Sequence, residues 1–336
     1  MSSTHGLTLG KYAPFHKGHQ YVIETALAEM DEVTVIIYDA PETTFVPLSV
    51  RSRWIKQLYP TVRVIEAWDG PTQIGDTEEI QRMHEKYVID TLGIRDITNF
   101  YSSEFYGEHM SLALGAVNRQ VNPQRSEVPI SATLIRENPF QNRSFLHPIV
   151  YQDLITKVVF VGAPSTGKST LAEYMAQRLN TVWMPEYGRE YWEQHQIERR
   201  LSPQQLVEIA EGHLERENQL LMHANQYLFC DTNAITTYMF GQAYHGYADV
   251  RLEALARQAQ SRYDIVFLCD VDIPYDDTWD RSGDVQRLVF QKQIVADLQT
   301  RNIPYFVLKG DVYTRAVKIE HVLQAFHKYK SLATEL

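Results

Sequence analysis

Short apolar runs alternate with longer amphipathic stretches along the whole chain. In the first half, residues 7–10 and 33–38 have the pattern of strands, and the segment 19–30 between them has the period of a helix. A second amphipathic run, 77–92, leads into a strand-like run at 97–102. A strand, a helix and a strand in succession predict parallel strands joined by a crossover helix. The first half is therefore predicted to form a small doubly wound α/β domain.

The second half shows the same alternation. Its strand-like runs are 158–161, 226–230, 265–269 and 305–308, and its helix-length segments include 203–225 and 285–300. Between the halves, prolines and polar residues without clear periodicity predict a linker near residues 145–154. We therefore predict an α/β protein of two domains, residues 1–147 and 155–336, each with a mostly parallel sheet.

Composition adds limits to this picture. The 336 residues leave room for two domains, and 44% hydrophobic with 22% charged residues is typical of a globular protein. A net charge of −10 argues against nonspecific nucleic-acid binding. No apolar stretch approaches the length of a membrane span, and the first residues lack the basic and apolar pattern of a signal peptide, so neither membrane insertion nor secretion is expected. The two cysteines, Cys230 and Cys269, lie in apolar runs and are expected to be buried thiols in a reducing compartment. We expect a cytoplasmic protein.

The most specific motif follows the first strand of the second half and reads G-A-P-S-T-G-K-S. It matches the phosphate-binding loop, in which backbone N–H groups surround a triphosphate at the start of a helix. Lys168 is expected to reach the β- and γ-phosphates, and the Ser169 hydroxyl to ligate Mg²⁺. The predicted ATP-binding residues of this loop are Gly162, Ala163, Pro164, Ser165, Thr166, Gly167, Lys168, Ser169 and Thr170. ATP or GTP is therefore predicted to bind here.

A second phosphate-binding pattern occupies the first half, where the first strand ends in G-K-Y-A-P-F-H-K-G-H. His16 and His19 are one helical turn apart and can face the same ligand. The partner string, I-S-A-T-L-I-R, offers Ser131 or Thr133 as a helix cap and Arg136 as a planar phosphate ligand. The two histidines alone would also fit a metal site or an unrelated capped helix, but no third ligand lies nearby in the sequence.

These motifs together resemble the NadR family of bifunctional enzymes. H-x-G-H with I-S-x-T-x-x-R is similar to the nucleotidyltransferase signature, and the P-loop follows it in the order of that family. Further similar segments are P-L-S-V-R at 47–51, S-E-F-Y-G at 103–107, E-Y-G-R-E-Y at 186–191, D-T-N at 231–233 and D-I-P at 272–274. The resemblance implies a Rossmann-like nucleotidyltransferase domain followed by a P-loop kinase domain. It also implies two reactions, phosphorylation of nicotinamide riboside by ATP and adenylylation of the resulting mononucleotide to NAD with release of pyrophosphate.

The resemblance also implies roles for residues of the first domain. His16 and His19 would contact the ATP phosphates, with Lys11, Arg136 and Thr133 beside them. The full set of residues expected to bind ATP in the first domain is Gly10, Lys11, His16, His19, Arg51, Ser131, Thr133 and Arg136. Arg51 is the weaker candidate, because a solvated helix charge would give the same pattern. Trp68 and Asp69 are expected to bind the substrate, although a core or interface role suits Trp68 equally.

In the second domain, two carboxylates follow strand-like runs. Asp231 stands where an acid holding Mg²⁺ through water is expected, and Glu186 stands where nucleoside kinases often keep a base. The sequence does not show which of the two acts as the base, which binds the ribose and which holds the metal, so we assign these roles to the pair. Tyr187 and Arg189 are also expected to bind the substrate. Arg281 and Arg287 resemble lid arginines, although exposed helix-start arginines would look the same. An aromatic residue usually precedes E-Y-G-R in the family, whereas Pro185 does here, so nicotinamide stacking would pass to Trp183, Tyr187 or Tyr191.

Other functions remain open on the sequence alone. Some members of the family carry a DNA-binding module ahead of the first strand, where only residues 1–6 stand here, so no nucleic-acid partner is expected. A nucleotide-sensing regulator with one weak domain is an alternative, as is another adenylyltransferase fused to a nucleoside kinase. The expected ligands are ATP, nicotinamide riboside, nicotinamide mononucleotide and NAD, with Mg²⁺ as cofactor. A homo-oligomer and coupling to a riboside transporter are further alternatives.

Overall fold

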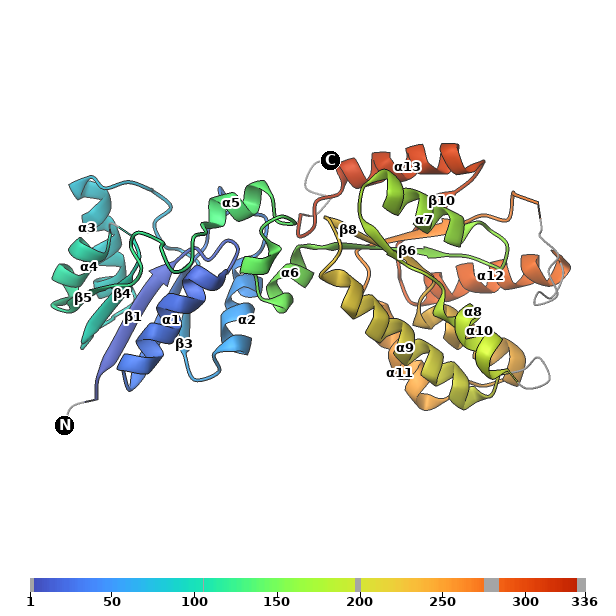
Figure 1. Cartoon of the computed structure of the whole chain (residues 1–336), viewed down its shortest axis with the longest axis horizontal. Helices are drawn as coiled ribbons and strands as arrows, with labels where there is room; N and C mark the ends of the chain where they lie inside the picture. Colours follow the sequence, from blue (N-terminus) through green and yellow to red (C-terminus); the bar gives the residue numbers. More distant parts are fainter. Residues whose placement is uncertain (1–2, 105, 197–200, 275–283, 331–336) are drawn as a thin grey trace. The chain divides into compact units, whose positions relative to one another are not determined.

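The chain forms two compact units in a computed structural model that describes residues 3–104, 106–196, 201–274 and 284–330. The first unit comprises residues 1–151 and 329–336, and the second comprises residues 152–328 (Figure 1). Arg281 lies outside the described residues. Each unit is built around its own parallel sheet.

The elements of the first unit follow one another as strand and helix. They are β1 (His5–Gly10), α1 (Lys17–Glu29), β2 (Glu32–Tyr38), α2 (Leu48–Leu58), β3 (Arg63–Ala67), α3 (Glu78–Lys86), the π-helical η1 (Tyr87–Thr91), β4 (Asn99–Ser102), α4 (Gly107–Leu114), β5 (Val117–Gln120), α5 (Ala132–Glu137), the 3₁₀ turn η2 (Arg143–Phe145) and α6 (Pro148–Leu154), whose last residues enter the second unit.

The second unit continues the alternation. Its elements are β6 (Thr156–Val161), α7 (Lys168–Arg178), β7 (Val182–Met184), α8 (Tyr187–His195), α9 (Pro203–Leu221), β8 (Tyr227–Asp231), α10 (Ala234–His245), α11 (Val250–Ala259), β9 (Ile265–Cys269), α12 (Asp284–Thr300), β10 (Phe306–Leu308) and α13 (Val312–Ala325).

The sheet of the first unit has the strand order β3-β2-β1-β4-β5 within the described residues. The inner strand β2, between β3 and the central strand β1, reads E-V-T-V-I-I-Y and is buried after its first residue, as a strand with both faces covered requires. The chain proceeds outward from β1 to β3 and then returns to place β4 on the other side of β1. Ligands of open α/β sheets bind where the order reverses, beyond the carboxyl ends of the strands. In this sheet that place lies beyond β1 and β4.

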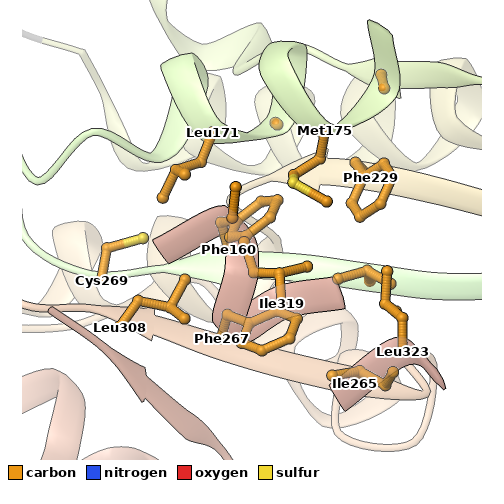
Figure 2. Packing of buried hydrophobic residues seen from close by; sticks show 14 residues of the cluster. Phe160, Leu171, Met175, Phe229, Ile265, Phe267, Cys269, Leu308, Ile319 and Leu323 are labelled. Atoms are coloured by element: carbon orange, nitrogen blue, oxygen red, sulfur yellow. The ribbon is translucent and has the colours of Figure 1, made fainter. Parts of the chain in front are cut away.

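The sheet of the second unit has the order β10-β9-β6-β8-β7 and is also parallel. Phe160, Phe229 and Phe267 from three adjacent strands form one layer of the core (Figure 2). Leu171 and Met175 of α7 and Ile319 and Leu323 of α13 cover this layer. The opposite face lies against α9 and α11 (Figure 1). The P-loop therefore leaves the central strand β6 at the carboxyl edge of a well-packed sheet.

Two details differ from or complete the sequence interpretation. The stretch 145–154, predicted as a linker without periodicity, contains α6, which begins at Pro148, where proline loses no helical hydrogen bond. Cys230 and Cys269 are free and buried, as predicted, on β8 and β9. Among the described residues, none of the helices has both the length and the apolar character needed to cross a bilayer.

Candidate functional site

A cavity of about 440 Å³ opens beyond β1 and β4 in the first unit, which we call the first-unit cavity. It lies where the order of the sheet reverses, as expected for a ligand site in this class of fold. Of the residues predicted to bind ATP in the first domain, those that line it are Gly10, Lys11, His16, His19, Ser131, Thr133 and Arg136. The structure thus brings the two distant motifs together in one cavity.

His16 and His19 cap the helix that follows β1. The Nδ1 atom of His16 accepts a hydrogen bond from the Gly18 amide at 3.1 Å, and the Nδ1 atom of His19 accepts one from the His16 amide at 3.3 Å. The rings stack with centroids 3.7 Å apart. Because a neutral imidazole that accepts at Nδ1 carries its proton at Nε2, both rings keep an Nε2–H group as a donor. The cap therefore fixes the tautomer of both histidines.

Burial keeps both rings neutral. It lowers the pKa of His16 to about 4, with the positive charge of Arg125 adding to the effect. The pKa of His19 also lies well below its usual value, mainly because of burial, with His16 and Arg125 contributing. A second proton would also turn each Nδ1 from an acceptor into a donor and break the cap. At neutral pH these histidines are hydrogen-bond donors rather than cations.

The lowered pKa values predict acid sensitivity of the first unit. As pH falls from about 6.5 to about 4, the unfolded chain protonates His16 while the folded chain does not, so the free energy of unfolding decreases. Asparagine is a good N-cap that does not titrate. We expect His16→Asn to weaken the pH dependence of stability over this range, as measured by chemical denaturation at several pH values. An unchanged slope would contradict the assigned protonation state.

Neighbouring residues shape the wall around the histidines. A Cβ atom on Gly18 would lie 2.9 Å from the His16 ring, so glycine is needed here to make room for that ring. Ser131 accepts the Leu134 amide at 3.3 Å and caps α5. Arg136 donates to the carbonyl oxygen of Ala13 at 2.6 Å and to the Thr133 hydroxyl at 3.0 Å. The second motif thus supports the loop that carries the first.

Three predicted residues do not line the first-unit cavity. Arg51 is fully buried, and its guanidinium donates to the carbonyls of Lys11, Tyr38 and Val46, so it is not a solvated charge and does not line the first-unit cavity. It holds the loop after β1 from behind. Trp68 is 56% exposed, with its indole N–H 3.2 Å from Glu66, and Asp69 accepts the Tyr87 hydroxyl. The loop that contains them reaches the cavity through Pro71, Gln73, Ile74 and Gly75 instead.

The cavity also contains polar residues that the sequence interpretation did not assign. Arg125 pairs with Glu104 at 3.4 Å and faces the same space as His16. His84 and Gln81 of α3 and His109 of α4 complete this wall. Arg125 has a positive φ of 53° in a turn after β5, and an isolated arginine in a turn carries no recognisable motif. These residues become neighbours only in the folded chain, where the segments around β4 and β5 lie next to β1, so the sequence alone does not show that they share a cavity.

In the second unit, the P-loop joins β6 to α7 in the conformation that its glycines allow. Gly162 has φ 145° and Gly167 has φ 83°, and a Cβ atom on Gly162 would lie 2.7 Å from the carbonyl oxygen of Cys269. Side chains would therefore strain the loop at both positions. Lys168 is largely buried and donates to the carbonyl oxygen of Ala163 at 3.0 Å. Its ammonium group thus lies over the loop that is expected to hold phosphates.

Side chains from outside the motif hold the P-loop. Arg315 of α13 donates to the carbonyl of Thr166 at 2.6 Å and pairs with Asp272 at 2.5 Å. Gln291 of α12 accepts the Ala163 amide at 2.8 Å. Arg287 is buried and donates to the carbonyl of Ser165 at 3.2 Å, so it contacts the P-loop and is not the exposed helix-start arginine that was the alternative to a lid residue. Arg315 and Gln291 were not predicted, because their motif-free helices lie more than 100 residues away.

Asp231 and Ser169 meet beside the P-loop. The Ser169 hydroxyl donates to Oδ2 of Asp231 at 2.5 Å, and the other carboxylate oxygen is buried without a hydrogen-bond partner among the described residues. Burial raises the pKa of Asp231, the nearby charge of Glu186 raises it further, and Lys168 opposes both. A hydroxyl and a carboxylate are oxygen ligands of the kind Mg²⁺ prefers, with phosphates and water supplying the rest. These two residues therefore fit a magnesium site completed by a nucleotide.

Of the remaining predicted residues, Glu186 and Arg189 act on this pair by their charges. Glu186 is the residue before α8, and its charge acts on Asp231, as does that of exposed Arg189. The ring of Tyr187 packs under the guanidinium of Arg216, 4.0 Å from its ring centroid, and occupies the space that a Cβ on Gly212 would need. Trp183, on β7, packs against the hydrophobic cluster that contains Phe229. Among the described residues, no group of three or more His, Cys, Asp and Glu side chains is arranged as a metal centre.

Comparison with known proteins divides the chain in the same way. A cytidylyltransferase-like family model matches residues 7–138, and an AAA domain model matches residues 157–315. A similar curated protein is the trifunctional NAD biosynthesis/regulator protein NadR of Salmonella typhimurium. It is 28% identical over 327 residues, covering 92% of this chain and 79% of that protein.

Two solved structures share the architecture of the chain. A NadR protein in complex with NAD and AMP-PNP has a TM-score of 0.59 and 20% identity, with 97% of both chains covered. A NadR protein in complex with NR has a TM-score of 0.58 and 22% identity, with 98% of both chains covered. At these identities the likeness establishes a shared fold, two successive α/β units that each contain a parallel sheet.

Proposed function

Because the chain belongs to the NadR family, with its nucleotidyltransferase and kinase roles in NAD biosynthesis, we propose that it converts nicotinamide riboside to NAD in two steps. The second unit transfers the γ-phosphoryl group of ATP to the riboside, which yields nicotinamide mononucleotide and ADP. The first unit then joins this mononucleotide to the adenylyl group of a second ATP. The order of the reactions is the reverse of the order of the domains in the chain.

The observation that supports the kinase step most directly is the hydrogen-bonded pair of Ser169 and Asp231 beside the P-loop. In this step the 5′-hydroxyl oxygen of the riboside attacks the γ-phosphorus, and the bond from that phosphorus to the bridging oxygen of ADP breaks. In this proposal Glu186 or Asp231 takes the hydroxyl proton. Lys168 and the loop amides stabilise the charge on the phosphates. Mg²⁺ held by Ser169 and Asp231 would neutralise the β- and γ-oxygens.

The adenylylation step needs no protein nucleophile, because the mononucleotide phosphate itself attacks the α-phosphorus of ATP. The bond between that phosphorus and the oxygen leading to the β-phosphate breaks, and pyrophosphate leaves. The Nε2–H groups of His16 and His19 offer fixed donors for the charge that builds on the leaving group. Arg136 and Lys11 line the same cavity and add positive charge.

Separate half-reactions test this proposal. With Mg-ATP and nicotinamide mononucleotide, the protein should release NAD and pyrophosphate in equal amounts. With Mg-ATP and the riboside, it should form ADP and mononucleotide, followed by NAD. Both reactions should stop when EDTA removes the magnesium. Tight nucleotide binding without conversion would instead support a sensor, and faster turnover of another nucleoside and its nucleotide would support a different adenylyltransferase and kinase pair.

A further inference from the structure

A second cavity lies in the second unit, on the sheet face that α9 and α11 cover. Its volume is about 200 Å³. Lys157 near the start of β6 and Arg262 and Tyr263 just before β9 line it. Because these strands run parallel, their starts lie at the edge opposite to the P-loop, which follows the end of β6. This cavity is therefore separate from the phosphate site.

The two acidic side chains next to this cavity, Glu217 and Asp264, already have partners. Glu217 is fully buried and accepts hydrogen bonds from Nε of Arg262 at 2.6 Å and from the Tyr263 hydroxyl at 2.8 Å. Arg262 also donates to the side chain of Asn218 at 2.7 Å. The Asp264 carboxylate accepts the backbone amide of Lys157 at 2.7 Å and pairs with Lys328 at 3.3 Å. The buried Glu217 and the partly buried Asp264 are thus both committed to other groups.

The His213 ring and the Lys157 ammonium, both on the cavity wall, lack such partners among the described residues. The Nε2 atom of His213 makes no hydrogen bond although the side chain is only 6% exposed, and it lies 3.9 Å from Glu217. No ion pair or side-chain hydrogen bond involves the ammonium of Lys157 in the described part of the chain. Burial and the charges of Arg262 and Lys328 lower the pKa of Lys157 against the pull of Glu217 and Asp264. An anion beside it would compensate this charge.

The rest of the wall and its size limit what can bind. Ala210, Leu214 and Leu255 supply apolar surface. A volume of about 200 Å³ exceeds the roughly 30 Å³ of one water several times but is below the roughly 300 Å³ of the smallest drug-sized sites. One uncompensated cation and one neutral ring nitrogen match a single negative charge, whereas the carboxylate of Glu217 would repel a dianion.

We propose that this cavity binds a small monocarboxylate with a compact apolar body, such as one aromatic ring. Its carboxylate accepts from the Lys157 ammonium and from His213 Nε2–H, and its apolar body contacts Leu214 and Leu255. This inference does not depend on the two reactions proposed above. Since Ala234, the first residue of α10, also lines the cavity three positions after Asp231, an occupant touches the helix that follows the kinase carboxylate.

Benzoate is a suitable probe, and its binding to the full-length protein can be followed by ligand-observed NMR titration. We expect saturable binding that Lys157→Met weakens at least about tenfold, because the charged hydrogen bond is lost while the apolar stem remains. Lys292→Met, which removes an exposed lysine of α12, should bind as the wild type does. Benzamide, which has the same shape but no charge, should bind at least about tenfold more weakly.

His213→Leu provides a second variant if Lys157→Met fails to fold, and it should also weaken benzoate binding. The proposal is overturned if benzoate shows no saturable binding, if both lysine variants bind it equally, or if benzamide matches it. Binding of inorganic phosphate but not of benzoate would likewise overturn it, because the occupant would then be a polar anion without an apolar body.

Discussion

Lys168→Ala is expected to slow riboside phosphorylation at least about 100-fold while leaving adenylylation of nicotinamide mononucleotide close to that of the unaltered protein. The ammonium lies over the P-loop, 3.0 Å from the Ala163 carbonyl, where it can move onto the phosphates as negative charge shifts toward ADP. Removing one such preorganised group from a catalytic site typically slows the reaction about 100- to 1,000-fold. Steady-state assays of the two half-reactions, each started from its own substrate, measure the difference.

The exposed lysine of α12 offers a matched control, because Lys292→Ala removes the same charge from the same unit. It should leave both reactions unchanged. Equal loss of both reactions in Lys168→Ala, in a protein that still unfolds cooperatively at the usual temperature, would argue against two separate sites.

His19→Ala is expected to give the reverse pattern, with adenylylation slowed about 100- to 1,000-fold and riboside phosphorylation retained. The ring donates from Nε2 because its Nδ1 accepts the His16 amide, so alanine removes a donor of fixed direction. With nicotinamide riboside as substrate, this variant should accumulate the mononucleotide without forming NAD. Chromatography of the nucleotides measures both outcomes.

His19 is also part of the helix cap, so its loss could act through stability. Glutamine at this position of a capping box can accept the same backbone amide. His19→Gln should therefore recover the thermal stability that His19→Ala loses, but not the adenylylation rate. Recovery of the rate along with the stability would show that the ring serves only as a cap.

The sequence predicted the parts of the fold that depend on local pattern. The apolar run of β6, the glycines of the P-loop and the capped start of α1 each carry their information within a few residues. The burial of Arg51 could not be predicted, because helical periodicity does not reveal that α2 places this residue against the carbonyls of Lys11 and Tyr38. Arg315 was not recognised for a related reason, since its contact with Thr166 spans 149 positions and leaves no spacing to detect.

The candidate sites divide in the same way. The motifs placed His16, His19 and Arg136 correctly around one cavity, because strand order alone brings the two signatures together. Arg125 and His84 enter that cavity from turns and helices without a motif. The sequence does not show that Lys157 lacks an ion pair, because its neighbouring acids, Glu217 and Asp264, take Arg262 and Lys328 as partners only in the folded chain. Residues in phosphate-binding motifs can thus be predicted from the sequence, whereas the residues that surround and support them cannot.

The most direct test of the proposed function follows the origin of each phosphate in NAD. The full-length protein is incubated with Mg²⁺, nicotinamide riboside and ATP labelled either at the γ- or at the α-phosphorus, and the NAD formed is cleaved between its two phosphates. The proposal predicts γ-label in the mononucleotide half and α-label in the adenylate half, with labelled mononucleotide appearing before NAD. Formation of neither labelled product, with ATP bound but unconverted, would contradict it.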